Sequence, residues 1–203
     1  MPFTLPNRLS LSLVSPNLAI ALLLSTATPI LFFIGEPLFS ALALVPEAVA
    51  QGDWWRLITG HWLHFTLYHL AINTLAFVII TALFFTQEPV KNYLLSLFLL
   101  SLVLGLSLML FKPEYSPYVG LSGLLHGLLA QGIILSKAYT HPIKSIALVL
   151  LFLKLLYEQS PWYSSADLEV AVGAHIATEA HAIGAFLGAA LGLGIVSCRR
   201  FYS

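Results

Sequence analysis

The sequence predicts an all-α fold, a polytopic membrane protein built as a single domain over residues 1–203. Apolar residues make up 59% of the 203 residues, and the mean hydropathy is +0.90. Charged residues make up 9%, against about 25% in soluble domains, so a soluble fold would lack a charged surface. The nine basic and nine acidic residues cancel, which gives no indication of nucleic-acid binding.

The spacing of the apolar runs is a further observation. Polar breaks divide the chain into six runs suited to transmembrane helices, and together they predict a six-helix bundle. These runs are residues 18–34, 67–85, 93–111, 121–138, 143–157 and 177–196. The first follows Arg8 as a signal peptide would, but its 17 uncharged residues are long for a signal core. Pro29 and Pro37 also disfavour cleavage, so we interpret this run as a retained span.

The breaks between the runs have the composition of loops. The first, residues 35–66, is the longest, and its Trp54, Trp55 and Trp62 are suited to the membrane interface. The later breaks contain proline or acidic residues, and they are 86–92, 112–119, 140–142 and 158–173.

Basic residues predict the orientation of the spans. With a cytoplasmic N-terminus, the cytoplasmic side holds Arg8, Lys91, Lys137, Lys144, Arg199 and Arg200. The outer side then holds only Arg56, Lys112 and Lys154. Because basic loops stay in the cytoplasm, we expect both termini there. Cys198 is the only cysteine, which excludes an intramolecular disulfide.

Polar residues of three different spans fall at a similar depth in this arrangement. His69 and Asn73 lie in the outer turns of the second span. Ser122 starts the fourth span, and His181 lies near the outer end of the sixth. Ionisable groups are costly inside a membrane, and side chains that only pack have no reason to share one level. The pattern therefore predicts one functional site in the outer leaflet.

Ser122 is the candidate nucleophile. It lies between Gly120 and Gly123 at the start of an apolar run. Glycines permit unusual backbone angles and close approach of a substrate, and free N–H groups at a helix start suit an oxyanion. The alternative is a serine that only caps or packs its helix.

His181 is the candidate general base. Glycines at four-residue spacing lie behind both it and Ser122, namely Gly184, Gly188 and Gly192, and Gly123 and Gly127. Such faces let two helices approach closely, which would bring His181 within hydrogen-bond reach of Ser122 as a serine–histidine dyad. The alternative is two ordinary packed helices that carry a polar histidine.

Other polar residues are candidates for supporting roles. His69 and Asn73 are i and i+4 on one helix face, where both can donate to an oxyanion or bond to neighbouring helices. His64 precedes the second span, and we expect it to brace the loop. His126 lies one turn below Ser122 and could orient the dyad or only pack against it.

The acidic member of a triad is not evident in the sequence. Glu179 is two residues from His181, so the two side chains point to different helix faces. His175 is a rival base, but it lacks a glycine repeat in register behind it.

A histidine-based metal or haem site is the main alternative to a serine enzyme. The candidate ligands are His61, His64, His69, His175, Glu179 and His181. There is no His-Glu-x-x-His sequence, and a metal would not explain the Gly-x-Ser-Gly element. We also find no convincing internal repeat of the kind that transporters carry. We therefore expect neither a metal nor a cofactor.

At these residues the chain resembles the rhomboid intramembrane serine proteases. The matching elements are Trp55-Arg56 with Thr59, residues 64–73, Gly120-Leu121-Ser122-Gly123, and His181 with Gly184 and Gly188. The resemblance implies that Ser122 is the nucleophile and His181 the base. It also implies an oxyanion hole made by His69, Asn73 and the Ser122 N–H, and a first loop partly in the membrane. Some rhomboid-like proteins are inactive chaperones that bind transmembrane helices, but the presence of both Ser122 and His181 argues against that role.

Within the family, Gly-Leu-Ser-Gly-x-x-His-Gly is similar to the rhombosortase subgroup. His126 takes the place of an aromatic residue that packs on the base in many rhomboids. The resemblance implies single-span substrates of Gram-negative bacteria that carry a C-terminal Gly-Gly-type sorting tail. It further implies a multi-pass protein of the inner membrane whose active site opens to the periplasm. Hydrolysis and transfer to an amine are both compatible with these residues.

Overall fold

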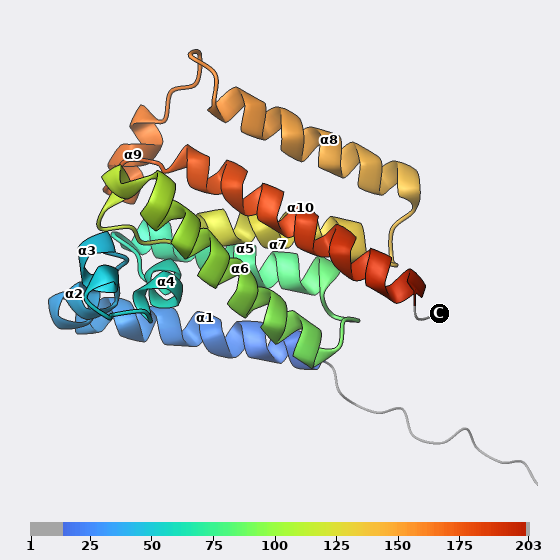
Figure 1. The fold of residues 1–203 in the computed structure, drawn as a ribbon, viewed down its shortest axis with the longest axis horizontal. Coiled ribbons are helices and arrows are strands. Elements are labelled where there is room, and N and C mark those ends of the chain that lie inside the picture. The colour runs from blue at the N-terminus through green and yellow to red at the C-terminus, as the bar shows by residue number, and fades with distance from the viewer. Residues whose placement is uncertain (1–13, 202–203) are drawn as a thin grey trace, which may run out of the picture.

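The computed structural model describes residues 14–201, which form a bundle of helices (Figure 1). Its long helices are α1 (Pro16–Ile34), α5 (Leu67–Phe84), α6 (Val90–Phe111), α7 (Ser122–Leu135), α8 (His141–Glu158) and α10 (Thr178–Phe201). Short helices lie in the loops, and they are α2 (Glu36–Leu42), α3 (Pro46–Ala50), α4 (Arg56–Thr59), η1 (Gly60–Trp62), η2 (Pro113–Tyr115) and α9 (Ala166–Val172). Arg8, used above to predict the orientation, lies outside the described residues.

The all-α, polytopic fold predicted from the apolar runs is confirmed. Within residues 14–201, four helices are long and apolar enough to cross a membrane by length and composition, namely α1, α5, α6 and α10. α7 is apolar but has only 14 residues, and α8 has 18 residues that include Lys144, Lys154 and Glu158. Each of the six predicted runs is helical. That α7 and α8 also span the membrane, and that the chain is a single domain, stay predictions.

Two of the predicted carboxyl ends differ from the observed helix ends by three residues or more. α7 stops at Leu135, three residues before the predicted end at 138, because Ser136 is extended. The Lys144 ammonium binds the carbonyl oxygens of Ile134 and Ser136 at 2.7 and 2.9 Å, which satisfies the helix end. α10 continues to Phe201 rather than ending at 196. Its last turn carries Arg199 and Arg200, and basic residues stabilise the negative end of a helix.

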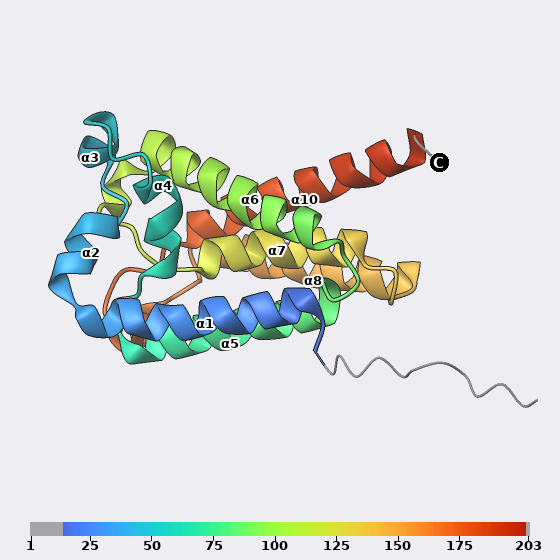
Figure 2. The same ribbon diagram turned by 90° about the horizontal axis from the view of Figure 1, so that it is seen from below.

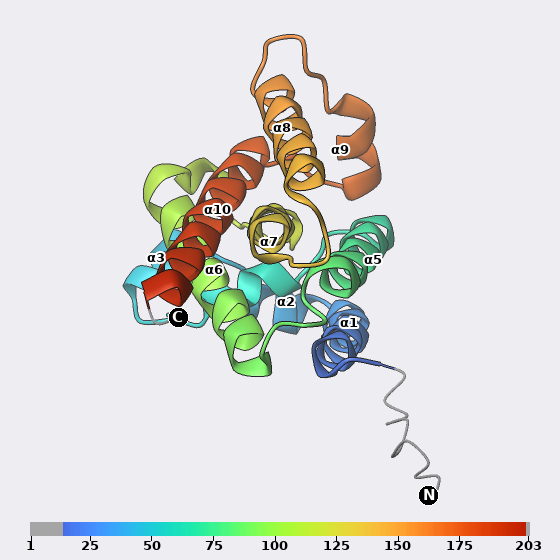
Figure 3. The same cartoon turned by 90° about the vertical axis from the view of Figure 1, so that its right-hand side faces the viewer.

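α7 lies at the centre of the bundle, surrounded by α5, α6, α8 and α10 (Figure 3). Most of its residues are buried, as expected for a helix contacted on all sides. α1 packs along α5, and α8 lies at the periphery (Figures 2 and 3). The start of α1 and the end of α10 lie at one end of the bundle, and α2, α3 and α9 lie at the other (Figure 2).

Glycines hold α7 against α10, as the sequence predicts. A Cβ on Gly127 would lie 2.8 Å from the carbonyl oxygen of Gly184, and one on Gly123 would lie 2.9 Å from that of Ala180. The two backbones are therefore in direct contact. Since neither helix has room for a methyl group at these points, the glycine faces determine the distance between α7 and α10.

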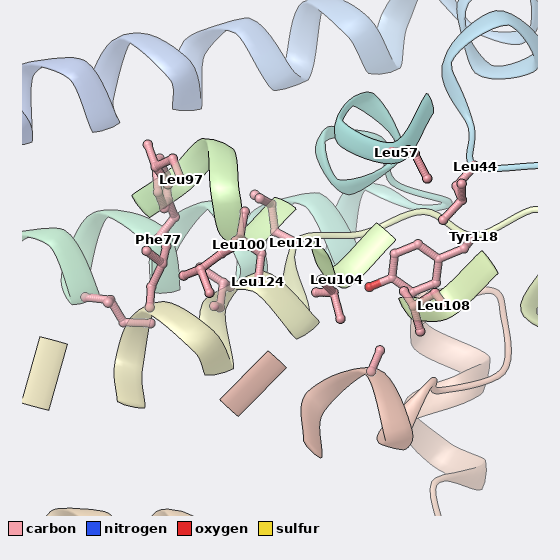
Figure 4. Close-up of a cluster of buried hydrophobic side chains, with 14 of the residues drawn as sticks. Leu44, Leu57, Phe77, Leu97, Leu100, Leu104, Leu108, Tyr118, Leu121 and Leu124 are labelled. Carbon is pink, nitrogen blue, oxygen red and sulfur yellow. The ribbon is translucent and has the colours of Figure 1, made fainter. Parts of the chain in front are cut away.

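The apolar core lies between α6, α7 and the first loop (Figure 4). Leu104 of α6 and Leu121 and Leu124 beside or within α7 are each no more than 1% exposed. Leu44 and Leu57 bring the first loop onto this core, where Leu44 also pairs with Tyr118 through two backbone hydrogen bonds. The core therefore joins the loop before α5 to the segment that leads into Ser122.

The tryptophans of the first loop do not share one environment. Trp54 and Trp55 are 62% and 49% exposed, as a membrane-interface position requires. Trp62, for which the sequence predicts the same role, is half-buried, and its ring packs on Phe77 with the centroids 5.5 Å apart. η1 turns this ring toward α5, and a membrane-interface position for the three tryptophans stays a prediction.

Candidate active site

Ser122 follows a backbone turn that requires glycine. Gly120 has φ +124°, and its N–H donates to the carbonyl oxygen of Gly60 at 3.1 Å. A Cβ at position 120 would also lie 2.9 Å from His69 Nε2. Both the backbone conformation and the nearby imidazole therefore exclude a side chain at this position, and the turn presents Ser122 as the first residue of α7.

His181 faces Ser122 from α10. Its Nε2 lies 3.0 Å from Ser122 Oγ, which is a hydrogen-bond distance between a hydroxyl and an imidazole. The ring of His181 is buried, whereas Ser122 is half-buried. The glycine contacts between α7 and α10 produce this short distance, since they lie directly below the two side chains.

Glu158 is a further member of this cluster, and it corrects the sequence analysis, in which no acidic partner of His181 is evident. Its two carboxylate oxygens lie 3.1 and 3.2 Å from His181 Nδ1. The two residues are 23 positions apart, and only the packing of α8 beside α10 brings them together. The available signal was Lys154 and Glu158, two charges four residues apart at the outer end of an apolar run.

His126 stacks on the base and touches the nucleophile's backbone. Its ring lies 4.3 Å from that of His181 at an interplanar angle of 16°. Its Nδ1 lies 2.7 Å from the carbonyl oxygen of Ser122, and its Nε2 lies 2.6 Å from Lys154 Nζ. A lysine ammonium can only donate, so Nε2 accepts and Nδ1–H donates to Ser122. These contacts fix the ring of His126 beneath the dyad.

The candidate oxyanion donors lie on the other side of Ser122. His69 and Asn73 are both buried on α5, and both face Gly120. Within the described part of the chain, Asn73 Nδ2 and His69 Nδ1 are buried and have no hydrogen-bond partner. A buried donor without a partner is costly, which is expected where the partner forms only during a reaction.

His64 lies beside His69 rather than beside Ser122. The two rings are 4.9 Å apart and nearly perpendicular. Burial, together with the neighbouring His69, lowers the pKa of His64 to about 3. His64 is therefore a neutral ring at physiological pH, and it packs in the loop against the candidate oxyanion donor.

The rival base and the rival acid have other partners. His175 Nδ1 pairs with Glu169 at 2.7 Å, and its ring stacks on Tyr115. Glu179 accepts from Lys112 Nζ at 2.7 Å and from the Tyr115 hydroxyl. The bond to Glu179 raises the pKa of Lys112. The geometry thus associates His181, and not His175, with Ser122.

The residues proposed as alternative metal ligands do not converge on one point, although His64 and His69 are neighbours. His61 bonds to the carbonyl oxygen of Ser101 at 3.0 Å, for example. The described residues contain one group that could hold a metal, His126, Glu158 and His181, whose ligand atoms lie within 4.8 Å of one another. The Lys154 ammonium contacts two of the three, at 2.6 Å from His126 and 2.7 Å from Glu158. A cation of the protein itself therefore already neutralises this group.

A cavity of about 560 Å³ opens beside Ser122 and His69. Residues 114–119 form one wall, and the turn between α9 and α10, including Ile176 and Ala177, forms another. Among the residues that line the cavity are Val172 of α9 and the turn after it, and α9 lies at the same end of the bundle as α2 and α3 (Figure 1). A segment of extended chain that entered it would bring a backbone carbonyl to the Ser122 hydroxyl.

Comparison with known families places this arrangement in context. The family model of the Rhomboid domain matches residues 51–198, which include α4 to α9, most of α10 and every residue of the cluster described above. A comparison with curated proteins gives no match. The family match covers 148 of the 203 residues (51 to 198), and its members are generally intramembrane serine proteases. The chain belongs to the rhomboid family.

Proposed function

We propose that this protein is an intramembrane serine endopeptidase with Ser122 as nucleophile and His181 as general base. The observation that carries the proposal is the 3.0 Å distance between Ser122 Oγ and His181 Nε2. A serine hydroxyl is a weak nucleophile, and an adjacent base within hydrogen-bond reach activates it. Two helices that meet through glycine place this pair beside a cavity and beside free buried donors.

The first half of the reaction forms an acyl-enzyme. Ser122 Oγ attacks the substrate carbonyl carbon as His181 Nε2 takes the hydroxyl proton. The oxyanion accepts from Asn73, His69 and the Ser122 N–H, which is free because it starts a helix. The C–N bond then breaks, and His181 returns its proton to the leaving amine.

The second half releases the new carboxyl end. Water loses a proton to His181 and attacks the acyl carbon, the ester bond to Ser122 breaks, and the proton returns to Ser122 Oγ. An amine in place of water would make the enzyme a transpeptidase. The cavity beside Ser122 supplies a path for either nucleophile.

The proposed substrate is a single-span membrane protein with a small-residue tail. A helix hides its carbonyls in internal hydrogen bonds, so the cleaved segment has to unwind at its outer end. Glycines favour this unwinding, which supports a C-terminal Gly-Gly-type tail as the substrate. The Gly-Leu-Ser-Gly-x-x-His-Gly element, shared with rhombosortases, supports the same choice.

We further propose that the cavity opens to the periplasm of a bacterial inner membrane. The end of α10 carries Arg199 and Arg200, and Lys91 lies at the start of α6 at that same end of the bundle. This end is opposite to the end that carries α9, whose Val172 lines the cavity (Figure 1). The positive-inside rule supports a cytoplasmic location for the basic end and an outer location for Ser122.

The experiment that tests the proposal is cleavage of a co-expressed protein with a Gly-Gly-type tail. The wild type is compared with Ser122→Ala and His181→Ala, and the new C-terminus is identified by mass spectrometry. We expect processing by the wild type alone. Equal processing by all three proteins would exclude the dyad. If none of the three proteins cuts the tail and each still binds the tail protein, the result would instead favour a helix-binding chaperone. The mass of the new end separates hydrolysis from transfer to an amine.

A further inference from the structure

Glu158 occupies an unusual position for a carboxylate. It is the one buried residue of α8, all of whose residues are described, and the rest of the helix is exposed or half-buried. Glu158 is also the last residue of α8, where the negative end of the helix disfavours another negative charge. Neither apolar packing nor helix stability explains a glutamate at this position. The explanation therefore has to come from the groups that its carboxylate contacts.

Two groups contact the carboxylate of Glu158. His181 Nδ1 lies 3.1 Å away, and Lys154 Nζ lies 2.7 Å away. A buried charge is tolerated where it is paired and hydrogen-bonded on several sides, and Glu158 meets this condition. The side chains of Glu158 and His181 are 7% and 8% exposed, so water contributes little to either.

The contacts of these side chains close into a ring. The hydroxyl of Ser122 donates to His181 Nε2, and His181 Nδ1–H donates to Glu158. The Lys154 ammonium donates both to Glu158 and to His126 Nε2, and His126 Nδ1–H donates to the Ser122 carbonyl oxygen. Each of these contacts joins a donor to an acceptor, and one tautomer of each histidine satisfies the whole ring. In this tautomer Nε2 of His181 is free to take the proton of Ser122.

We propose that Glu158 is the positioning residue of His181, held in place by Lys154, which His126 holds in turn. The proposal rests on the proposed protease function and adds a third side chain to the dyad. Glu158 fixes the tautomer and orientation of His181 and stabilises the imidazolium that forms when His181 takes the proton. Lys154 neutralises Glu158 in the resting protein, so that the buried carboxylate does not stand alone.

The test is the rate at which a fluorophosphonate labels Ser122 in the full-length protein in detergent. This probe reacts with an activated serine without docking a transmembrane helix, so it separates base activation from substrate binding. We expect Glu158→Gln to slow labelling by up to about 10⁴-fold, the loss of kcat found when the carboxylate of a serine triad is replaced by an amide. Glu158→Asp keeps the charge on a shorter side chain, and we expect a rate between those of Glu158→Gln and the wild type.

A matched control is Glu88→Gln. Glu88 is also a paired carboxylate, half-buried and bonded to Arg199 at 3.2 Å, but it lies beside the carboxyl end of α10, away from Ser122. We expect Ser122 of the Glu88→Gln variant to be labelled at the wild-type rate. This control separates the positioning of His181 from a general loss of folding caused by removing a paired carboxylate. With the tail substrate, Glu158→Gln should lower kcat and leave KM unchanged.

A second readout follows His181 directly. In protein labelled with ¹⁵N-histidine, Glu158→Gln should shift the ring nitrogens of His181, since an amide leaves the tautomer unfixed. Labelling of Glu158→Gln at the wild-type rate, or unchanged His181 shifts, would overturn the positioning role while the dyad stands. If the wild-type Ser122 does not react at all and Glu158→Gln still shifts His181, the proposed function fails although the Glu158 contact is real.

Discussion

Gly127 and Gly184 are in backbone contact, since a Cβ on Gly127 would lie 2.8 Å from the carbonyl oxygen of Gly184. One turn closer to the cavity, the same helices carry Ser122 and His181 at 3.0 Å from each other. The distance between α7 and α10 therefore determines the distance between Ser122 Oγ and His181 Nε2. A change to the glycine face is a change to the site.

The first prediction concerns Gly184→Ala. The added methyl group would overlap the backbone of Gly123, so α10 has to move away from α7. We expect a loss of about 1–3 kcal/mol of unfolding free energy, as for other overpacked contacts, and slower labelling of Ser122. Gly194→Ala is the control on the same helix, because nothing lies within 4 Å of a Cβ there. Equal thermal unfolding of the two variants in detergent would contradict the tight contact.

The second prediction concerns the oxyanion. Asn73→Ala removes a buried Nδ2 donor that has no hydrogen-bond partner in the described residues, so no bond from this donor is lost in the ground state. We expect kcat to fall by about 10²–10³-fold while KM for the tail substrate is unchanged. Thr74→Ala, one residue further along α5, removes only a bond to the Leu70 carbonyl oxygen and should retain activity. A rise in KM alone would indicate that Asn73 binds substrate instead.

The third prediction concerns zinc. Lys154→Ala removes the ammonium that contacts His126 and Glu158, and leaves three ligand atoms within 4.8 Å of one another. Two imidazoles and a carboxylate are a typical zinc ligand set. We expect Zn²⁺ to bind Lys154→Ala, measured by calorimetry, and a chelator to release it. The wild type and Lys91→Ala, an exposed lysine, should bind none at this position. Binding by the wild type would show that Lys154 does not protect the site.

The parts of this protein that could be predicted are those with a local or periodic signal. The apolar runs identify the six long helices because polar breaks bound each run on both sides. The glycines behind Ser122 and His181 identify the contact between α7 and α10, since four-residue spacing lies on one helix face. Ser122 itself is identifiable because Gly120 and Gly123 flank it.

Glu158 could not be assigned in the same way. Its partner depends on where α8 lies relative to α10, and the sequence of α8 does not determine that, since apolar residues occur on every face of this helix. The ring contact of His126 with Lys154 joins residues 28 positions apart for the same reason. Trp62 differs from Trp54 and Trp55 only through the turn of η1, which composition does not encode.

The last prediction concerns the first loop and its effect on Ser122. The guanidinium of Arg56 is buried, donates to the carbonyl oxygens of Ser40 and Ala43 at 2.7 and 2.9 Å, and pairs with Asp53. Arg56→Gln removes most of these bonds, and a bond to a charged donor is worth about 1.5–3 kcal/mol. We expect a fall in unfolding free energy of about that size or more, measured by thermal unfolding in detergent.

Arg56→Gln should also lower the reactivity of Ser122. The loop that Arg56 holds also supplies the Gly60 carbonyl, which accepts from Gly120 N–H in the turn before Ser122. We therefore expect Arg56→Gln to slow fluorophosphonate labelling below the temperature at which it unfolds, whereas Lys137→Gln, on the exposed opposite side, should not. Arg56→Lys should restore little of the stability or of the labelling rate, because one ammonium cannot reproduce a planar guanidinium that contacts three oxygens. Full rescue by lysine would mean that charge alone, rather than the geometry of these bonds, holds the loop against the site.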